Sequence, residues 1–102
     1  MSTSYHAAIV YGLPYELANA IIDNLDDLID EGEIDTFSPY YDASREESLV
    51  GVEIQRSPDY GYREVDVQND VAAQERIDTE GKALEEIFGE ETLKVYITTV
   101  GY

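Results

Sequence analysis

Apolar residues occupy alternate positions, or nearly every position, in four short stretches of the chain. In YHAAIVYG (5–12) both faces of an extended segment are mostly apolar, which predicts a central strand. Apolar and polar residues alternate in SLVGVEIQ (48–55) and YREVDVQ (62–68), and RSPDYG (56–61) between them has the composition of a turn. LKVYITTVGY (93–102) is rich in β-branched residues. The pattern therefore predicts four strands, of which the middle two form a hairpin.

Helical spacing begins at Pro14, whose fixed φ suits the first turn of a helix. At 100° per residue, the apolar side chains of residues 14–31 fall on one arc, formed by Leu17, Ala18, Ile21, Ile22, Leu25, Leu28 and Ile29. The opposite arc is acidic and consists of Glu16, Asp23, Asp26, Asp27, Asp30 and Glu31. Gly32 follows at the usual stop position. The sequence thus predicts one amphipathic helix with an acidic solvent face.

A second helix is predicted over residues 70–89. The apolar residues that share its face are Ala73, Ile77, Leu84, Ile87 and Phe88. Glu80 falls inside this apolar arc, so we expect a kink or a restart near Gly81, with Thr79 as the N-cap. Residues 33–48 are expected to form a connecting loop.

The predicted order is strand, helix, strand, strand, helix, strand. It corresponds to a single α+β domain over residues 1–102, with the β-α-β-β-α-β order of ferredoxin-like folds. In that fold a four-stranded antiparallel sheet carries both helices on one face. Because this fold serves many unrelated functions, it assigns none by itself.

Charge changes the picture more than any motif does. The chain has 23 Asp and Glu residues against 6 Lys and Arg, a formal net charge of −17. Nine carboxylates precede Arg45, whereas no Lys or Arg does. Asp30 and Glu31 stand at the negative end of the predicted helix, where they oppose its dipole and invite a functional explanation. Direct binding to nucleic acid or to anionic membranes is disfavoured by this charge.

The common catalytic and cofactor motifs are absent from the sequence. There is no cysteine, the single histidine, His6, lies in an apolar strand, and neither GxGxxG nor GxxxxGK[ST] occurs. DDLIDEG superficially resembles a calcium loop, but aligning Gly32 with the required glycine puts Ile29 where an oxygen ligand belongs. We therefore expect a protein that is not an enzyme, with no metal and no cofactor.

The acidic block itself is the candidate site, interpreted as a surface for a basic partner. Along a continuous helix, its carboxylates would follow one another at roughly 4–5 Å, comparable to the phosphates of a DNA strand. Tyrosine is favoured at recognition surfaces, and two tyrosines lie in the loop beside the acid. The predicted partner-binding residues are Glu16, Asp23, Asp26, Asp27, Asp30, Glu31, Glu33, Asp35, Tyr40 and Tyr41.

In size and charge alone, the chain resembles the small acidic inhibitors of phages and mobile elements. Those proteins block restriction enzymes, CRISPR effectors or other host DNA-binding proteins. The resemblance implies a DNA mimic that occupies a basic groove on a nucleic-acid-binding or defence protein. The start of the sequence, MSTSYHAAIVYG, lacks a basic segment and a long apolar run, so we expect no signal peptide or membrane span and a place in the cytoplasm. If the gene is carried by a phage, this is the cytoplasm of the host.

Two alternatives remain open at this stage. In the first, the chain is a regulatory module that forms a homodimer or binds a small ligand through a sheet face lined by Tyr96, Thr98 and Val100. In the second, the acidic residues serve only to keep the protein surface hydrated. Halophilic adaptation is the special form of solvation, favoured by having only two lysines and disfavoured by nine isoleucines. An apolar exposed sheet face would favour the module, and a contiguous acidic face would favour the mimic.

Overall fold

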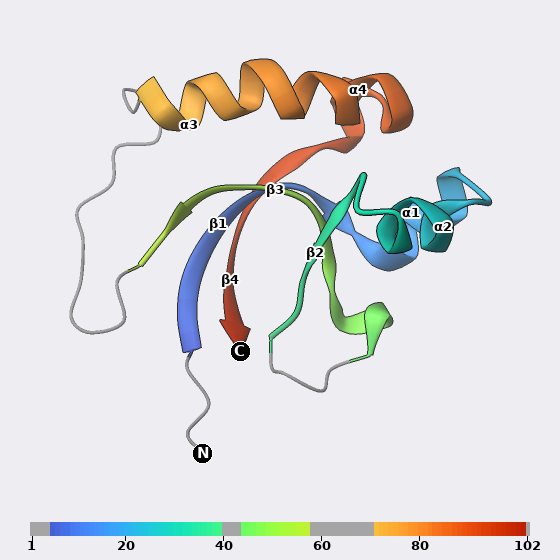
Figure 1. Ribbon diagram of the computed structural model, residues 1–102, viewed down its shortest axis with the longest axis horizontal. Coiled ribbons are helices and arrows are strands. Elements are labelled where there is room, and N and C mark those ends of the chain that lie inside the picture. Colours follow the sequence, from blue (N-terminus) through green and yellow to red (C-terminus); the bar gives the residue numbers. More distant parts are fainter. Residues whose placement is uncertain (1–4, 40–43, 58–70, 102) are drawn as a thin grey trace.

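Four strands form one open, antiparallel sheet in a computed structural model that describes residues 5–39, 44–57 and 71–101. The strands are β1 (Tyr5–Pro14), β2 (Asp35–Phe37), β3 (Leu49–Arg56) and β4 (Lys94–Gly101). Their spatial order is β2-β3-β1-β4, and all three pairings are antiparallel (Figure 1). The prediction that β1 is a central strand is confirmed, because β3 and β4 flank it.

Two helical layers pack on the same face of this sheet. One contains α1 (Tyr15–Ile21) and α2 (Leu25–Asp30). The other is a continuous rod of α3 (Val71–Arg76), the π-helical segment Ile77–Gly81 and α4 (Lys82–Phe88), which crosses above β1 and β3 in Figure 1. The chain is therefore an α+β domain, as predicted.

One large core joins both helical layers to the sheet. Its buried side chains are Leu13, Tyr15, Ala18, Leu25, Ile34, Val50, Val52, Ile54, Ala73, Leu84, Phe88 and Leu93. A smaller cluster of Ala8, Val10, Phe37 and Val100 lies on the opposite face of the sheet. Both faces of β1 are thus buried, which is why its sequence is apolar at nearly every position.

The predicted single helix over residues 14–31 is wrong, because the chain is extended at Ile22 (φ −126°, ψ 148°) and begins a new helix after Asn24. Asp and Asn favour turns and helix starts over helix interiors, so the pair at residues 23 and 24 is a natural breaking point. The break keeps Leu25 fully buried, but it leaves Leu17 and Ile21 exposed at 44% and 41%. Apolar spacing alone did not reveal the change of axis.

The prediction of a loop over residues 33–48 is also wrong. Residues Asp35–Phe37 form β2, which pairs with the start of β3, and Arg45–Glu47 form the 3-10 helix η1. A three-residue edge strand is fixed by its pairing partner more than by its own sequence, so the local pattern is too short to show it. The predicted strand over residues 62–68 lies outside the described residues, as do residues 58–61 of the predicted turn over 56–61, Tyr40 and Tyr41.

The predicted second helix is confirmed over residues 71–88, and the irregularity expected near Gly81 is the π-helical segment Ile77–Gly81, after which α4 begins at Lys82. Thr79 is not an N-cap, because it lies inside that segment. The hydroxyl of Thr79 instead donates to the Glu75 carbonyl oxygen (2.7 Å), one turn back in the same helix. The π-helical segment adds a residue to this turn, which takes Glu80 out of the apolar arc and exposes it. Buried Gly81 lies against the ring of Tyr11, where a Cβ would come within 3.1 Å of the ring carbons.

Tyr11 also ties the helical rod to the sheet through its hydroxyl, which donates to Glu85 Oε1 (2.8 Å). Burial, followed by this hydrogen bond and the charge of Glu85, raises the pKa of Tyr11 to about 12. The phenol is therefore held as a neutral donor.

Beside Tyr11, β1 and β3 approach each other at a pair of glycines. Gly12 and Gly51 are cross-strand partners. A Cβ at Gly12 would overlap the Val50 carbonyl oxygen, and a Cβ at Gly51 would overlap the Tyr11 carbonyl oxygen. Because both obstacles are backbone atoms inside a paired sheet, no side-chain movement can relieve the overlap.

We therefore expect Gly12→Ala to destabilise the protein by about 1–3 kcal/mol, the usual range for overpacking a buried site. Urea unfolding followed by far-UV circular dichroism measures this change. Gly51→Ala should have a similar effect, and the double variant should lose less than the sum because both substitutions open the same strand pair. A loss below about 0.5 kcal/mol for either single variant would contradict the proposed close packing.

Candidate functional site

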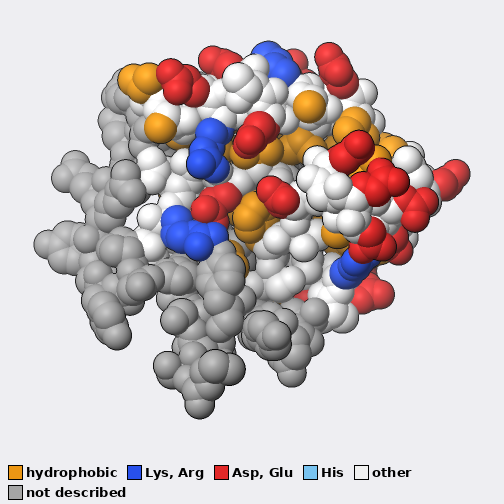
Figure 2. All heavy atoms as spheres, viewed as in Figure 1, with side chains coloured by type: hydrophobic (Ala, Val, Ile, Leu, Met, Phe, Trp, Pro, Cys, Tyr) orange, Lys and Arg blue, Asp and Glu red, His pale blue; other side chains and the backbone are white. Residues whose placement is uncertain are grey.

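Carboxylates gather over α1, α2 and the turn that follows, which lie to the right in Figure 2. All eight carboxylate residues predicted from the sequence are exposed: Glu16, Asp23, Asp26, Asp27, Asp30, Glu31, Glu33 and Asp35. Because the helix is broken at residues 22–24, they do not follow a single axis as a regular row. They form a patch on two short helices, the segments that follow each of them and the first residue of β2, which we call the acidic face.

Arg45 supplies an internal partner for two of these residues. Its guanidinium contacts Asp26 Oδ1 (2.9 Å) and Asp30 Oδ1 (2.6 Å), so η1 is held against α2. The hydroxyl of Tyr15 donates to the same Asp26 oxygen (2.7 Å). The hydrogen bonds from Tyr15 and then from Arg45 lower the pKa of Asp26 below its ordinary value. A cation near the last turn of α2 also offsets the unfavourable dipole interaction expected for Asp30.

The other six predicted carboxylates have no such partner among the described residues. Within that part of the chain, no side-chain hydrogen bond or ion pair involves the carboxylate of Glu16, Asp23, Asp27, Glu31, Glu33 or Asp35. We call these six the unpaired carboxylates. Their mutual repulsion opposes folding, but their charge remains available to a partner.

The turn after α2 positions two of the unpaired carboxylates. Gly32 has the left-handed φ of 78° that favours glycine. Its N–H donates to the Ile29 carbonyl oxygen (3.0 Å), and the N–H of Glu33 donates to that of Leu28 (2.9 Å). This pair of bonds is the Schellman motif, which ends a helix and reverses the chain. The reversal carries Glu33 and Asp35 from the end of α2 to the edge of the sheet.

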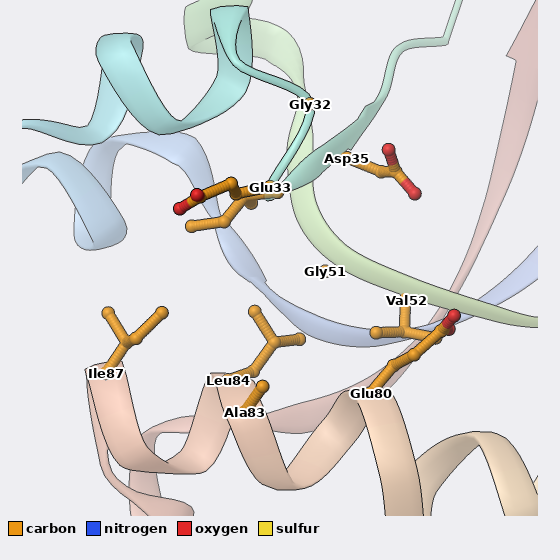
Figure 3. A pocket seen from close by; sticks show the side chains of 10 residues that line it. Gly32, Glu33, Asp35, Gly51, Val52, Glu80, Ala83, Leu84 and Ile87 are labelled. Carbon is orange, nitrogen blue, oxygen red and sulfur yellow. The ribbon is translucent and has the colours of Figure 1, made fainter.

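A cleft of about 210 Å³ opens beneath this turn, between the turn, β3 and the helical rod. Val52, Leu84 and Ile87 form its apolar part, and Glu33, Asp35 and Glu80 lie around it. Figure 3 shows Leu84 and Ile87 pointing from the rod toward Glu33 on the turn, with Glu80 beside Val52. We call this feature the acidic cleft.

Sequence reasoning placed Glu33 and Asp35 in the candidate site but missed Glu80 and the cleft. In the sequence pattern Glu80 only interrupts an apolar helical arc. Because 45 residues separate it from Asp35, no local pattern places the two side chains at one cleft. Its anomalous position in an apolar arc was the only signal, and the π-helical segment explains that anomaly.

The sheet face proposed for a homodimer or a small ligand differs from the expectation. Val100 is buried, with 4% of its surface exposed, and Tyr96 and Thr98 are half-buried. The exposed apolar side chains of β4 are on its other face, where Val95 and Ile97 are 52% and 77% exposed. An exposed apolar surface lined by Tyr96, Thr98 and Val100 is therefore not present.

Arg45→Gln should destabilise the protein at neutral pH, because it leaves Asp26 and Asp30 next to each other without a cation. The pKa of folded Asp26 lies below the ordinary 3.8, so its stabilising contribution is present above pH 3.8 and is lost as the pH falls through the folded value. Urea midpoints measured at neutral pH and well below pH 3.8 should show the deficit only at neutral pH.

Lys94→Gln is the matched control for Arg45→Gln, since it removes one exposed positive charge from β4 and no ion pair in the described part of the chain involves Lys94. At low salt its urea midpoint should fall less than that of Arg45→Gln, and high salt should narrow the difference. Equal losses in both variants would mean that net charge, and not the contact with Asp26 and Asp30, sets the effect.

The remaining observations on the described residues add no other site. In ranges 5–39, 44–57 and 71–101, no group of three or more His, Cys, Asp or Glu side chains is arranged to hold a metal ion. The helices of that part of the chain are all too short or too polar to cross a membrane. Comparison with protein-family models, with curated proteins and with solved structures found no match.

Proposed function

We propose that this chain is a small acidic binding protein whose acidic face occupies a basic groove on a nucleic-acid-binding or defence protein. The carrying observation is that six exposed carboxylates of the acidic face have no side-chain partner among the described residues. By contrast, Asp26 and Asp30 of the same face are used to hold η1 in place. Two carboxylates of the acidic face therefore stabilise the fold, and the six unpaired carboxylates are left to bind cationic groups of a partner.

The surface chemistry favours a protein partner over nucleic acid. With a net charge of −17, the chain is repelled by phosphates and attracted by clustered Lys and Arg. Complementary charge speeds the association of two proteins and makes it sensitive to salt. The binding of nucleic acid to a basic groove is salt-sensitive for the same reason. The break between α1 and α2 means that the resemblance to DNA is one of charge density over a patch, since a regular row along one helix is ruled out.

The ferredoxin-like class is also part of this proposal. Its support is the order β1, α1–α2, β2, β3, α3–α4, β4 along the chain, together with a sheet order in which β1 and β3 lie between β2 and β4. In this arrangement the second strand is Asp35–Phe37, and the acidic face lies on the first crossover between β1 and β2. An inhibitory role, carried by a phage or mobile element, follows from the proposed mimicry.

The test is affinity capture from a bacterial lysate at moderate salt, with bound proteins identified by mass spectrometry. The probe variant Glu16→Gln/Asp23→Asn/Asp27→Asn/Glu31→Gln removes four unpaired carboxylates but keeps the contacts of Arg45 and the acidic cleft. We expect it to lose a nucleic-acid-binding protein that the natural chain enriches, by roughly tenfold or more. Duplex DNA added to the lysate should compete for the same protein.

The matched control is Glu75→Gln/Asp78→Asn/Glu86→Gln/Glu91→Gln, which removes the same charge from exposed positions on the helical rod and the turn after it. It should retain capture within about threefold. An equal loss of capture in the two variants would mean that net charge alone accounts for the binding. Unchanged capture by the probe variant, or capture of no nucleic-acid-binding protein at all, would overturn the proposal.

A further inference from the structure

The carboxylates around the acidic cleft differ from those that the fold uses elsewhere. Glu53 and Glu85 contact Arg56 and Lys82 at 2.7 and 3.4 Å. Glu33, Asp35 and Glu80 come from the turn, β2 and the helical rod, and no ion pair or hydrogen bond in the described part of the chain involves their side-chain carboxylates. Three elements therefore bring uncompensated negative charge to one cleft.

The same cleft has an apolar interior. Val52 and Leu84 are buried, with 7% and 4% of their surface exposed, whereas Ile87 at the edge of the cleft is 39% exposed. Gly51 contributes no side chain to the lining. The cleft volume of about 210 Å³ lies below the roughly 300–1,000 Å³ of pockets that take a whole small molecule, so the cleft suits a single side chain.

We infer that the acidic cleft receives one arginine or lysine side chain of the basic partner protein. The aliphatic stem would lie on Val52, Leu84 and Ile87, and the cationic group would lie at the end of the cleft where Asp35 and Glu80 are, opposite the end at which Glu33 lies (Figure 3). This inference rests on the proposed function and deepens it, because it gives the acidic face an anchor with a definite shape. Long cationic side chains bury their stems along apolar surface while the charged group stays near acid and water.

The chemistry of the cleft excludes the other simple occupants. An anion would be repelled by three carboxylates, and a purely apolar group would remove water from them without compensation. The described carboxylates are not arranged to chelate a metal ion, so their charge suits a cationic group on a long stem better than a small ion. Interface anchors of this kind, with arginine prominent among them, carry much of the binding energy of protein complexes.

The experiment is a titration of the ¹⁵N-labelled full chain with blocked Gly-Gly-X-Gly-Gly peptides, followed by amide chemical shifts. X is arginine or lysine, diaminopropionic acid as a cation with a short stem, or norleucine as a stem without charge. We expect the arginine and lysine peptides to bind at least about fivefold more tightly than either control. The largest shifts should fall on residues 32–35, 51–52 and 80–87.

Ala83→Leu fills the cleft without changing the charge of the chain, because Ala83 lies on the exposed side of α4 and lines the cleft. Leucine is a strong helix former, so the helix should be retained. Ala20→Leu makes the same exchange at an exposed position of α1 outside the cleft. We expect Ala83→Leu to weaken the arginine peptide at least fivefold and Ala20→Leu to leave it within twofold.

The outcomes separate this inference from the proposed function. Equal binding of the arginine and diaminopropionic acid peptides, or no effect of Ala83→Leu, would overturn the anchor, even if lysate capture still depends on Glu16, Asp23, Asp27 and Glu31. Selective binding of the arginine peptide in the cleft would support the anchor, even if no nucleic-acid-binding protein is captured. In that case the proposed function fails alone.

Discussion

The close approach of β1 and β3 at Gly12 and Gly51 is the constraint on which the rest of the structure depends. It lets the two backbones pack with no side chain between them, inside a sheet that curves beneath the helical rod (Figure 1). Tyr11, next to Gly12, then reaches Gly81 and Glu85 and fixes the rod over the sheet. Gly51 also lines the acidic cleft, so one strand contact serves both the core and the candidate site.

Charge in this protein is divided between structural and unpaired groups. Arg45 contacts both Asp26 and Asp30 and thereby holds the segment that leads into β3. Tyr15, at the start of α1, donates a hydrogen bond to the same Asp26 oxygen. The unpaired carboxylates do nothing comparable within the described chain. Keeping them exposed on two short helices opposes folding through repulsion, so their presence requires a benefit outside the fold. In the proposed function a basic partner supplies that benefit, and a cleft that accepts one cationic side chain would give the encounter a fixed position.

Local sequence patterns predicted the elements that are determined locally. The apolar run of β1, the stop at Gly32 and the helix over residues 71–88 all follow from short-range spacing. The features that the sequence did not reveal depend on distant partners. The strand Asp35–Phe37 needs β3 beside it, and Arg45 finds Asp26 only after the chain reverses twice. The break at residues 22–24 was hidden because apolar residues continue at helical spacing through it.

The candidate site was predictable to a similar degree. The acidic block was evident as composition, and the exposure of its carboxylates follows from the amphipathic pattern of residues 14–31. The pairing of some of those carboxylates, and the presence of Glu33 and Glu80 around one cleft, are consequences of tertiary packing and could not be deduced from spacing.

The central claim is that the unpaired carboxylates oppose the fold and are present for a partner. The most direct test is the free energy of unfolding in urea, at low and high salt, of the variant that replaces Glu16, Asp23, Asp27 and Glu31 with amides. The account predicts that the variant is at least as stable as the natural chain at low salt and that any gain shrinks as salt is added. A variant that is less stable at low salt, or that needs molar salt to fold, would show that this charge serves hydration of the folded protein and would contradict the account.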